Sequence, residues 1–301
     1  MQIGHILLGL IIIILIWILI EQKLLVTTKY TVLSDKLPKA FHNTSFIVLS
    51  DLHNFRFGKD NKRLIKKINE LSPEFIIVAG DIINKQEACY PSNAYSLLNR
   101  LAVHYKIYYA YGNHEQWMKD LLERSEQESI ASTWVEYKKN LKNSGVIFLD
   151  NESILIQKDG SKLRITGVSI DEKYFVHRKM PVMEEGYLKS LIGKKPEEVY
   201  ELLIAHSPVY FPNYTEWGAD LTVSGHTHGG LVRLPGIGGV VSPQVLMFPK
   251  YDSGNYTEKG QHMIVSRGLG SHSMMPRMFN APEIVSVTLK NDSDNYETHK
   301  L

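Results

Sequence analysis

Short runs of apolar residues, each followed by a polar side chain, alternate along the chain with amphipathic stretches. The apolar runs at 45–50, 75–80 and 106–112 have the length of buried strands, and residues 62–71 repeat their apolar positions with helical spacing. Further strands are predicted at 146–149, 154–157, 163–168, 200–205, 221–224 and 283–289, and helices at 95–101 and 117–141. The pattern predicts an α/β sheet core with a second sheet packed on it.

The first apolar segment differs from all the others. Residues 3–20 read IGHILLGLIIIILIWILI, in which His5 is the only titratable side chain. A helix of this length is just long enough to cross the hydrocarbon core of a bilayer. A cleaved signal peptide is the alternative, but no Lys or Arg precedes the run and EQKLLVTTKY offers no small-residue cleavage site. We therefore predict an uncleaved transmembrane anchor over residues 1–22.

The remaining chain divides by composition into three parts. We expect a polar connector over residues 23–44, one catalytic domain over residues 45–290 and a polar tail over residues 291–301. The positive-inside rule favours a cytoplasmic domain behind this single-pass anchor, because lysines follow the span. These are Lys23, Lys29, Lys36 and Lys39.

Composition excludes several classes of protein. The chain has 34 Lys and Arg residues against 32 Asp and Glu, and a net charge of +2 is too small to indicate nucleic-acid binding. Its single cysteine, Cys89, excludes an internal disulfide and any multi-cysteine metal site. A hydrophobic fraction of 44% with 22% charged residues excludes a fully disordered chain.

Five of the apolar runs end at or next to an Asp, Asn or His. Ligands of α/β sheets gather at the carboxyl ends of strands, so five such ends suggest one site. Carboxylate, amide and imidazole groups together are suitable ligands for divalent transition metals. The segments are SDLHN (50–54), GDIIN (80–84), GNHE (112–115), AHSP (205–208) and GHTHGG (225–230).

These five segments, in this order, resemble the motifs of the calcineurin-like metallophosphoesterase superfamily, and most closely its membrane-anchored bacterial branch. The resemblance runs from about residue 46 to residue 289. It implies a four-layer α/β/β/α sandwich and two metal ions, drawn from Mn, Fe and Zn. It assigns Asp51, His53, Asp81 and His228 to one metal, and Asn113, His206 and His226 to the second, with Asp81 bridging both.

The resemblance also implies the chemistry. Two divalent cations supply a bound hydroxide at neutral pH and neutralise the charge that builds on phosphorus. We expect metal-dependent hydrolysis of a phosphoester, in which the bridging carboxylate of Asp81 is essential. In the family, the histidine at the position of His114 faces the substrate and can protonate the leaving oxygen. Glu115 is expected to orient either His114 or its loop.

Contacts to the substrate are less well defined by the sequence. Arg277 could clamp a phosphate, and Asn54 could contact substrate, although an ordinary loop surface is the alternative for Asn54. Met274, Met275, Met278 and Phe279 crowd one loop. Core packing explains this cluster, and the alternative is an apolar lip that meets an acyl chain or the bilayer.

Three functions are compatible with these motifs. We rank first the hydrolysis of a phosphodiester or pyrophosphate bond in a membrane-associated, lipid-linked substrate. The alternative within the same chemistry is a broad-specificity phosphomonoesterase. A non-catalytic membrane scaffold is disfavoured, because all seven family ligands and His114 are present.

Overall fold

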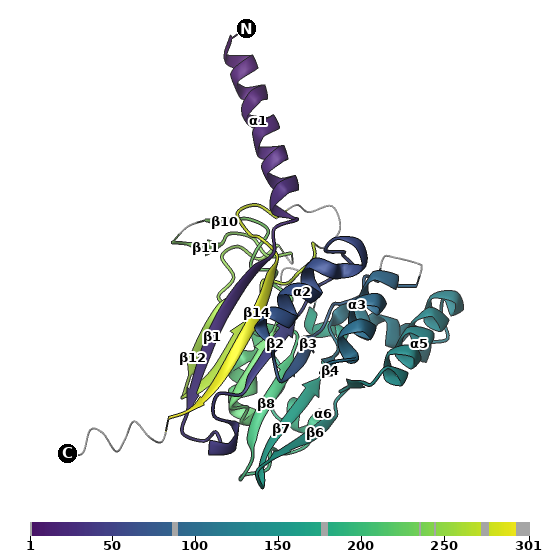
Figure 1. Cartoon of the computed structure of the whole chain (residues 1–301), viewed down its shortest axis with the longest axis vertical. Coiled ribbons are helices and arrows are strands. Elements are labelled where there is room, and N and C mark those ends of the chain that lie inside the picture. The colour runs from purple at the N-terminus through teal and green to yellow at the C-terminus, as the bar shows by residue number, and fades with distance from the viewer. Residues whose placement is uncertain are drawn as a thin grey trace, which may run out of the picture.

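Two six-stranded sheets lie face to face, with helices on both outer faces, in a computed structural model of the whole chain (Figure 1). The structure describes residues 2–85, 90–175, 180–234, 236–243, 245–271 and 277–292. This arrangement confirms the predicted four-layer α/β/β/α sandwich. Three of the strands that end in candidate ligands belong to the first sheet, and two belong to the second.

The first sheet has the order β1-β14-β2-β3-β4-β5. Strands β2 to β5 run parallel, whereas β14 is antiparallel to β2 and parallel to β1. The parallel arrangement brings the carboxyl ends of β2, β3 and β4 to one edge. The strands are β1 (Val26–Ser34), β2 (Ser45–Leu49), β3 (Phe75–Ala79), β4 (Lys106–Ala110), β5 (Val146–Phe148) and β14 (Glu283–Asn291).

The second sheet has the order β12-β13-β9-β8-β7-β6, in which β13, β9, β8 and β7 are parallel. Its strands are β6 (Ser153–Lys158), β7 (Ser161–Val168), β8 (Tyr200–Ala205), β9 (Leu221–Ser224), β12 (Gly254–Glu258) and β13 (Gln261–Val265). The short strands β10 (Arg233–Leu234) and β11 (Gly238–Gly239) form a separate antiparallel pair.

Apolar side chains from both sheets form the central core, which includes Val48 and Ile77 of the first sheet and Ile204 of the second. The outer face of the first sheet packs against α2 (Lys62–Leu71), α3 (Ser92–Ala102), α4 (Asn113–Glu123) and α5 (Glu128–Asn143). The second sheet is covered by α6 (Tyr187–Ile192) and α7 (Phe211–Trp217). Short 3-10 turns occur at η1 (Lys39–Phe41), η2 (Lys59–Asn61), η3 (Glu172–Phe175) and η4 (Pro208–Tyr210).

Several elements differ from the sequence prediction. The elements α6, α7, β12 and β13 were not predicted, and two further differences have a clear physical reason. The single helix expected over 117–141 is two helices, α4 and α5, which are separated by a polar turn with left-handed residues at Ser125 and Gln127. The expected connector at 23–44 contains β1, which pairs with β14 along its whole length. The alternating polar residues of this edge strand concealed it, because only its partly covered face needs apolar side chains.

The helix α1 (Gln2–Glu21) projects away from the sandwich (Figure 1). Residues 4–21 are long and apolar enough to cross a membrane, a test that a signal sequence also passes. The end of α1 is joined to the domain, since Glu21 is 4% exposed and its Oε2 accepts a hydrogen bond from the backbone N–H of Phe279 at 2.7 Å.

Candidate metal centre

The candidate ligands from both sheets meet at one place. Asp51 and Asp81 follow the ends of β2 and β3, and Asn113 begins α4 after β4. His206 follows β8, and His226 follows β9. Both sheets present the carboxyl ends of parallel strands at the same end of the sandwich. Residues 175 positions apart therefore become neighbours, as the contact of His53 with His228 shows.

The first group of buried ligands consists of Asp51, His53 and His228. The Nε2 atoms of the two imidazoles face each other at 3.1 Å, and the rings are stacked with an angle of 11° between their planes. The Nε2 atom of His228 also lies 3.4 Å from Asp51 Oδ1. Two ring nitrogens and a carboxylate oxygen thus point at a common centre, which is the donor set that a transition-metal ion takes.

The second group consists of Asp81, His206 and His226, also buried. His206 Nε2 lies 3.1 Å from Asp81 Oδ2 and 3.8 Å from Asp51 Oδ1, so this histidine links the two groups. Its Nδ1 is 2.7 Å from the carbonyl oxygen of Ala79. A carbonyl only accepts, so Nδ1 carries the proton and the Nε2 lone pair of the neutral ring is directed to the carboxylates.

The electrostatics of the cluster are those of a site built for cations. Burial opposes protonation of His206, but the carboxylates of Asp81 and Asp51 raise its pKa to about 10. Burial also raises the pKa of Asp51 to about 6. The pKa of Asp81 is lowered despite its burial, because His206 and His114 stabilise the anion. Two buried carboxylates need compensating positive charge, which protons supply in the metal-free protein.

The side chain of Asn113 adds an oxygen donor. Its Oδ1 atom is buried and has no hydrogen-bond partner within the part of the chain that the structure describes. Buried amide oxygens are normally paired, and a cation satisfies such an atom as well as a hydrogen-bond donor does. The donor set therefore fits two metal ions.

The backbone at the site adopts conformations that are rare elsewhere in proteins. Asp51, His53, Asp81, His226 and His228 all have left-handed φ values, between 48° and 70°. Such conformations cost free energy for residues with a side chain and cluster at functional sites. They turn consecutive side chains sharply inward at the strand ends, where an extended backbone would direct neighbouring residues to opposite faces.

Glycines allow the ligand loops to approach one another closely. A Cβ atom at Gly112 would lie well inside van der Waals contact of Asp81 Oδ1, and one at Gly225 would overlap Asp51 Oδ2 in the same way. A third such position, Gly268, lies outside the sequence motifs, and a Cβ there would lie 2.6 Å from the Cβ of Asp51. The only sequence signal for it is the glycine pair in SRGLG.

Glu115 organises the loops beneath the cluster. This fully buried carboxylate accepts hydrogen bonds from the backbone N–H groups of residues 81, 82, 83 and 112, at 2.8, 2.9, 3.2 and 2.9 Å. It also accepts a bond of 2.7 Å from the hydroxyl of Tyr109. Burial and the nearby charge of Asp81 raise the pKa of Glu115, whereas these donors lower it. Of the two roles expected for Glu115, these hydrogen bonds support orientation of the loop.

His114 lies beside the cluster with a defined tautomer. Its Nδ1 accepts a hydrogen bond of 3.0 Å from the backbone N–H of Lys85, so the neutral ring carries its proton on Nε2. That atom lies 3.8 Å from Asp81 Oδ2, and the ring is 4.7 Å from the ring of His53. His114 also belongs to a third group of potential ligands with His53 and Asp81. The tautomer provides an N–H donor next to the proposed metal ions.

The two predicted substrate contacts have other partners. Asn54 Oδ1 accepts hydrogen bonds from the backbone N–H groups of Asn93 and Ala94, at 3.1 and 3.0 Å, at the beginning of α3. Such bonds satisfy the free donors of a helix N-terminus. This structural role for Asn54 gives no support to a substrate contact.

Arg277 lies behind His228 and is 1% exposed. Its Nη2 donates to His228 Nδ1 at 3.1 Å and to the carbonyl oxygen of Gly270, and burial lowers its pKa to about 10. A neutral His228 that binds a metal through Nε2 carries its proton on Nδ1, so this contact with Arg277 belongs to the metal-free protein. Met274 and Met275 lie outside the described residues.

Two sheets packed face to face bring aspartates, histidines and an asparagine together at their strand ends. This combination of fold and site defines a class of metal-dependent hydrolase. The sequence model of the calcineurin-like phosphoesterase family matches residues 44–230, and the chain belongs to this family. It is accordingly a phosphoester hydrolase with His and Asp clusters that suit a dinuclear metal site.

Three relatives place the chain among similar proteins. An uncharacterized metallophosphoesterase of Bacillus subtilis, YkuE, is 28% identical over 276 residues, which cover 90% of this chain and 87% of the relative. The phosphodiesterase YaeI of Escherichia coli is 24% identical, covering 75% and 74%. A zebrafish protein described as a transmembrane protein with a metallophosphoesterase domain is 25% identical, covering 85% of this chain and 55% of the relative.

Proposed function

We propose that this chain is a membrane-anchored hydrolase that cleaves a phosphodiester or pyrophosphate bond of a membrane-associated, lipid-linked substrate. The observation that carries the proposal is the junction of two buried ligand groups, Asp51 with His53 and His228, and Asp81 with His206 and His226. His206 connects the groups, since its Nε2 lies within 4 Å of both carboxylates. Two metal ions side by side, with one shared carboxylate, would satisfy this arrangement.

We assign one metal to Asp51, His53, Asp81 and His228, and the other to Asp81, Asn113, His206 and His226. The metals are drawn from Mn, Fe and Zn, because the mixture of nitrogen and oxygen donors does not select one of them. When bound, the two ions supply a nucleophile at neutral pH and neutralise charge on the phosphoryl group.

The protein's own residues position these groups and move the proton. Glu115 holds the backbone on both sides of Asp81, through bonds to the N–H groups of residues 81 and 112. The Lys85 N–H keeps the Nε2 proton of His114 directed to the cluster. Donation of this proton to the departing oxygen is the role we assign to His114, since an alkoxide is a poor leaving group until it is protonated.

The position of Glu21 supports an uncleaved anchor. Its carboxylate is buried in the domain and bonded to Phe279, so removal of residues 1–22 would expose the partner N–H. We assign α1 to a single membrane span and, from the lysines that follow it, the domain to the cytoplasmic side. Mass spectrometry of the protein extracted from membranes should find residues 1–22 intact, and a mature chain that begins after residue 22 would refute the anchor.

The reaction is tested with full-length protein in detergent, supplied with Mn²⁺, Fe²⁺ or Zn²⁺. We expect faster hydrolysis of bis-p-nitrophenyl phosphate than of p-nitrophenyl phosphate, and loss of both activities in Asp81→Asn. The surface variant Val103→Ala, at a side chain 74% exposed, is the matched control and should retain full activity. Preference for the monoester would favour the phosphomonoesterase, and absence of both activities with every metal would refute the proposal.

A further inference from the structure

Four loop segments near the ligand loop that carries His226 and His228 are joined by backbone hydrogen bonds into one unit, which we call the loop platform. It consists of residues 231–234, 236–243, 245–248 and 277–279. The Met278 N–H donates a hydrogen bond to the Leu231 carbonyl oxygen, and the Val240 N–H donates to the Val232 carbonyl oxygen. Phe248 N–H in turn donates to Val240. These bonds, of 2.8 to 2.9 Å, give the platform a defined shape.

The platform exposes large apolar side chains. Its exposed members are Leu234 (40%), Ile237 (62%), Val245 (48%), Met247 (60%), Phe248 (59%) and Phe279 (53%). Other large apolar side chains that are exposed outside α1 belong to other parts of the chain, such as Val103 after α3 and Val182 before α6. Single exposed apolar residues are common on soluble proteins, whereas a group of six on adjoining loops indicates a surface that another apolar phase covers.

The platform adjoins the end of α1 (Figure 1). The ring of Phe279 lies 6.5 Å from the ring of Trp17, and the Phe279 N–H donates to Glu21 at 2.7 Å. Tryptophan near the end of a membrane-spanning helix lies at the level of the lipid headgroups. Phe279, which contacts it, must then lie at a similar depth.

We infer that the loop platform rests in the headgroup region of the same bilayer that α1 crosses. The apolar tips would enter the boundary between headgroups and acyl chains, where burial of apolar area is favourable. Two exposed lysines accompany them: Lys23 follows α1, and Lys250 follows Phe248 and the half-buried Pro249. Cations at this position attract anionic headgroups. The inference rests on the anchor of the proposed function but not on its metal chemistry.

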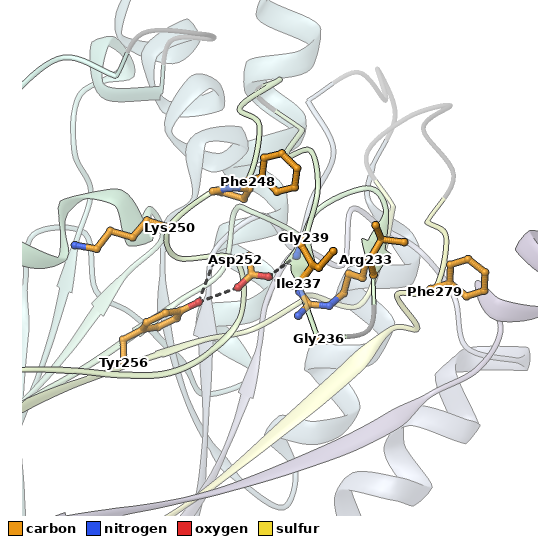
Figure 2. A pocket seen from close by; sticks show the side chains of 12 residues that line it. Arg233, Gly236, Ile237, Gly239, Phe248, Lys250, Asp252, Tyr256 and Phe279 are labelled. Carbon is orange, nitrogen blue, oxygen red and sulfur yellow. Dashed lines mark hydrogen bonds and ion pairs between the residues drawn. The ribbon is translucent and has the colours of Figure 1, made fainter.

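A hollow within the platform opens between these apolar tips. It has a volume of about 650 Å³, and Ile237, Phe248 and Phe279 are among its lining residues (Figure 2). Arg233 and Asp252 also line it, with an ion pair of 2.9 Å. Arg233 also donates to the carbonyl oxygen of Gly229, the residue after His228. The membrane-facing surface is therefore bonded directly to a ligand loop, which would bring the metal centre near substrates held in the bilayer.

Depth-dependent quenching tests the placement on full-length protein in phosphatidylcholine–phosphatidylglycerol vesicles. The single native cysteine, Cys89, is first replaced by serine, and Ile237→Cys and Phe248→Cys are labelled separately with an environment-sensitive dye. Leu19→Cys in α1 is the positive control, and the highly exposed Val103→Cys and Val182→Cys are the negative controls. Each label is then quenched with brominated lipids.

We expect brominated lipids to quench the labels at 237 and 248 strongly, as they quench the label at 19, and to leave the labels at 103 and 182 unquenched. Quenching at 19 without quenching at 237 and 248 would overturn the platform while keeping the anchor. Absence of quenching at 19 would overturn the anchor, and the platform with it. Hydrolysis of bis-p-nitrophenyl phosphate by each labelled variant reports separately on the metal centre.

A second measurement connects the platform to turnover. The variant Ile237→Asp/Phe248→Asp should hydrolyse a soluble phosphodiester at the wild-type rate. It should hydrolyse a vesicle-bound phosphodiester more slowly, by up to about tenfold, because each charge placed at the headgroup boundary costs free energy. Val103→Asp/Val182→Asp, with the same charge change on exposed sites, should match wild type on both substrates. Equal loss on both substrates, or no loss on either, would contradict a membrane-facing platform.

Discussion

Replacement of Glu115 by glutamine tests how the protein holds the metal centre together. The carboxylate accepts five hydrogen bonds: Oε2 from the N–H groups of residues 81 and 112, and Oε1 from residues 82 and 83 and the Tyr109 hydroxyl. A glutamine amide has one oxygen, and its nitrogen only donates. In its better orientation, Glu115→Gln therefore leaves at least two buried N–H groups without an acceptor.

The size of the effect follows from those two bonds. A hydrogen bond to a charged acceptor contributes roughly 1.5–3 kcal/mol, so two lost bonds cost about 4 kcal/mol. The neutral amide recovers part of this loss, because burial and Asp81 raise the pKa of Glu115 and so oppose its ionisation. We expect a net destabilisation of about 3 kcal/mol. Metal affinity should fall roughly tenfold to a hundredfold, because the backbone of Asp81 loses its support.

Urea unfolding of the EDTA-treated protein in detergent, followed by near-UV circular dichroism, measures the stability, and calorimetric titration with Mn²⁺ measures the affinity. Glu123→Gln on the same helix is the matched control, since its side chain is 64% exposed and its free energy of unfolding should change by about 0.5 kcal/mol or less. If Glu115→Gln unfolds at the wild-type urea concentration and binds Mn²⁺ equally well, the carboxylate does not organise the loops as we argue.

Three further predictions concern the centre and its surroundings. His114→Ala should lower kcat by roughly 10²–10⁴ with unchanged metal content by elemental analysis, and metal loss would contradict its role as proton donor. Gly112→Ala should weaken Mn²⁺ binding about tenfold or more, because its Cβ overlaps Asp81, whereas Gly9→Ala in α1, with open space around it, should not. The third prediction concerns Asp252, whose pKa is lowered from its ordinary 3.8: burial raises it, but hydrogen bonds from the Gly239 N–H and the Tyr256 hydroxyl lower it further. The ionised Asp252 therefore stabilises the fold above pH 3.8, and this contribution is lost as the pH falls through the lower pKa of the folded state. Wild type should lose thermal stability between about pH 5 and 3 more steeply than Asp252→Asn, and parallel curves would contradict this assignment.

The strand ends of the site were predictable because their signal is local. An apolar run that stops at Asp51, Asp81 or His206 identifies both the strand and the ligand, and parallel strands bring such ends together. The role of Glu115 was only partly predictable, because it depends on N–H groups from two separate loops that converge in the fold. The edge strand β1 was missed because its alternating polar residues resemble a connector, and its partner β14, more than 250 residues later in the chain, gives no local signal of the pairing.

The loop platform could not be predicted from the sequence, for a related reason. Its apolar side chains are distributed over segments separated by tens of residues, and none of these segments has a helical or strand periodicity. The sequence favoured core packing for the cluster Met274, Met275, Met278 and Phe279 and gave an apolar lip as the alternative; the structure describes Met278 and Phe279 of this cluster. Only the pairing of residues 231–233 with residue 278 shows that the other exposed residues belong to the same surface.

The charges at the centre connect metal binding to proton release. In the metal-free protein, Asp81 and Asp51 hold the pKa of His206 near 10, and burial raises the pKa of Asp51 to about 6, so the cluster retains protons at neutral pH. A metal ion supplies the same positive charge and requires the deprotonated ligand. The two therefore compete for one site: metal binding must release protons, and affinity must rise with pH through the neutral range. The protons bound by the cluster thus compensate the two buried carboxylates in the metal-free protein, and the cations replace these protons when they bind.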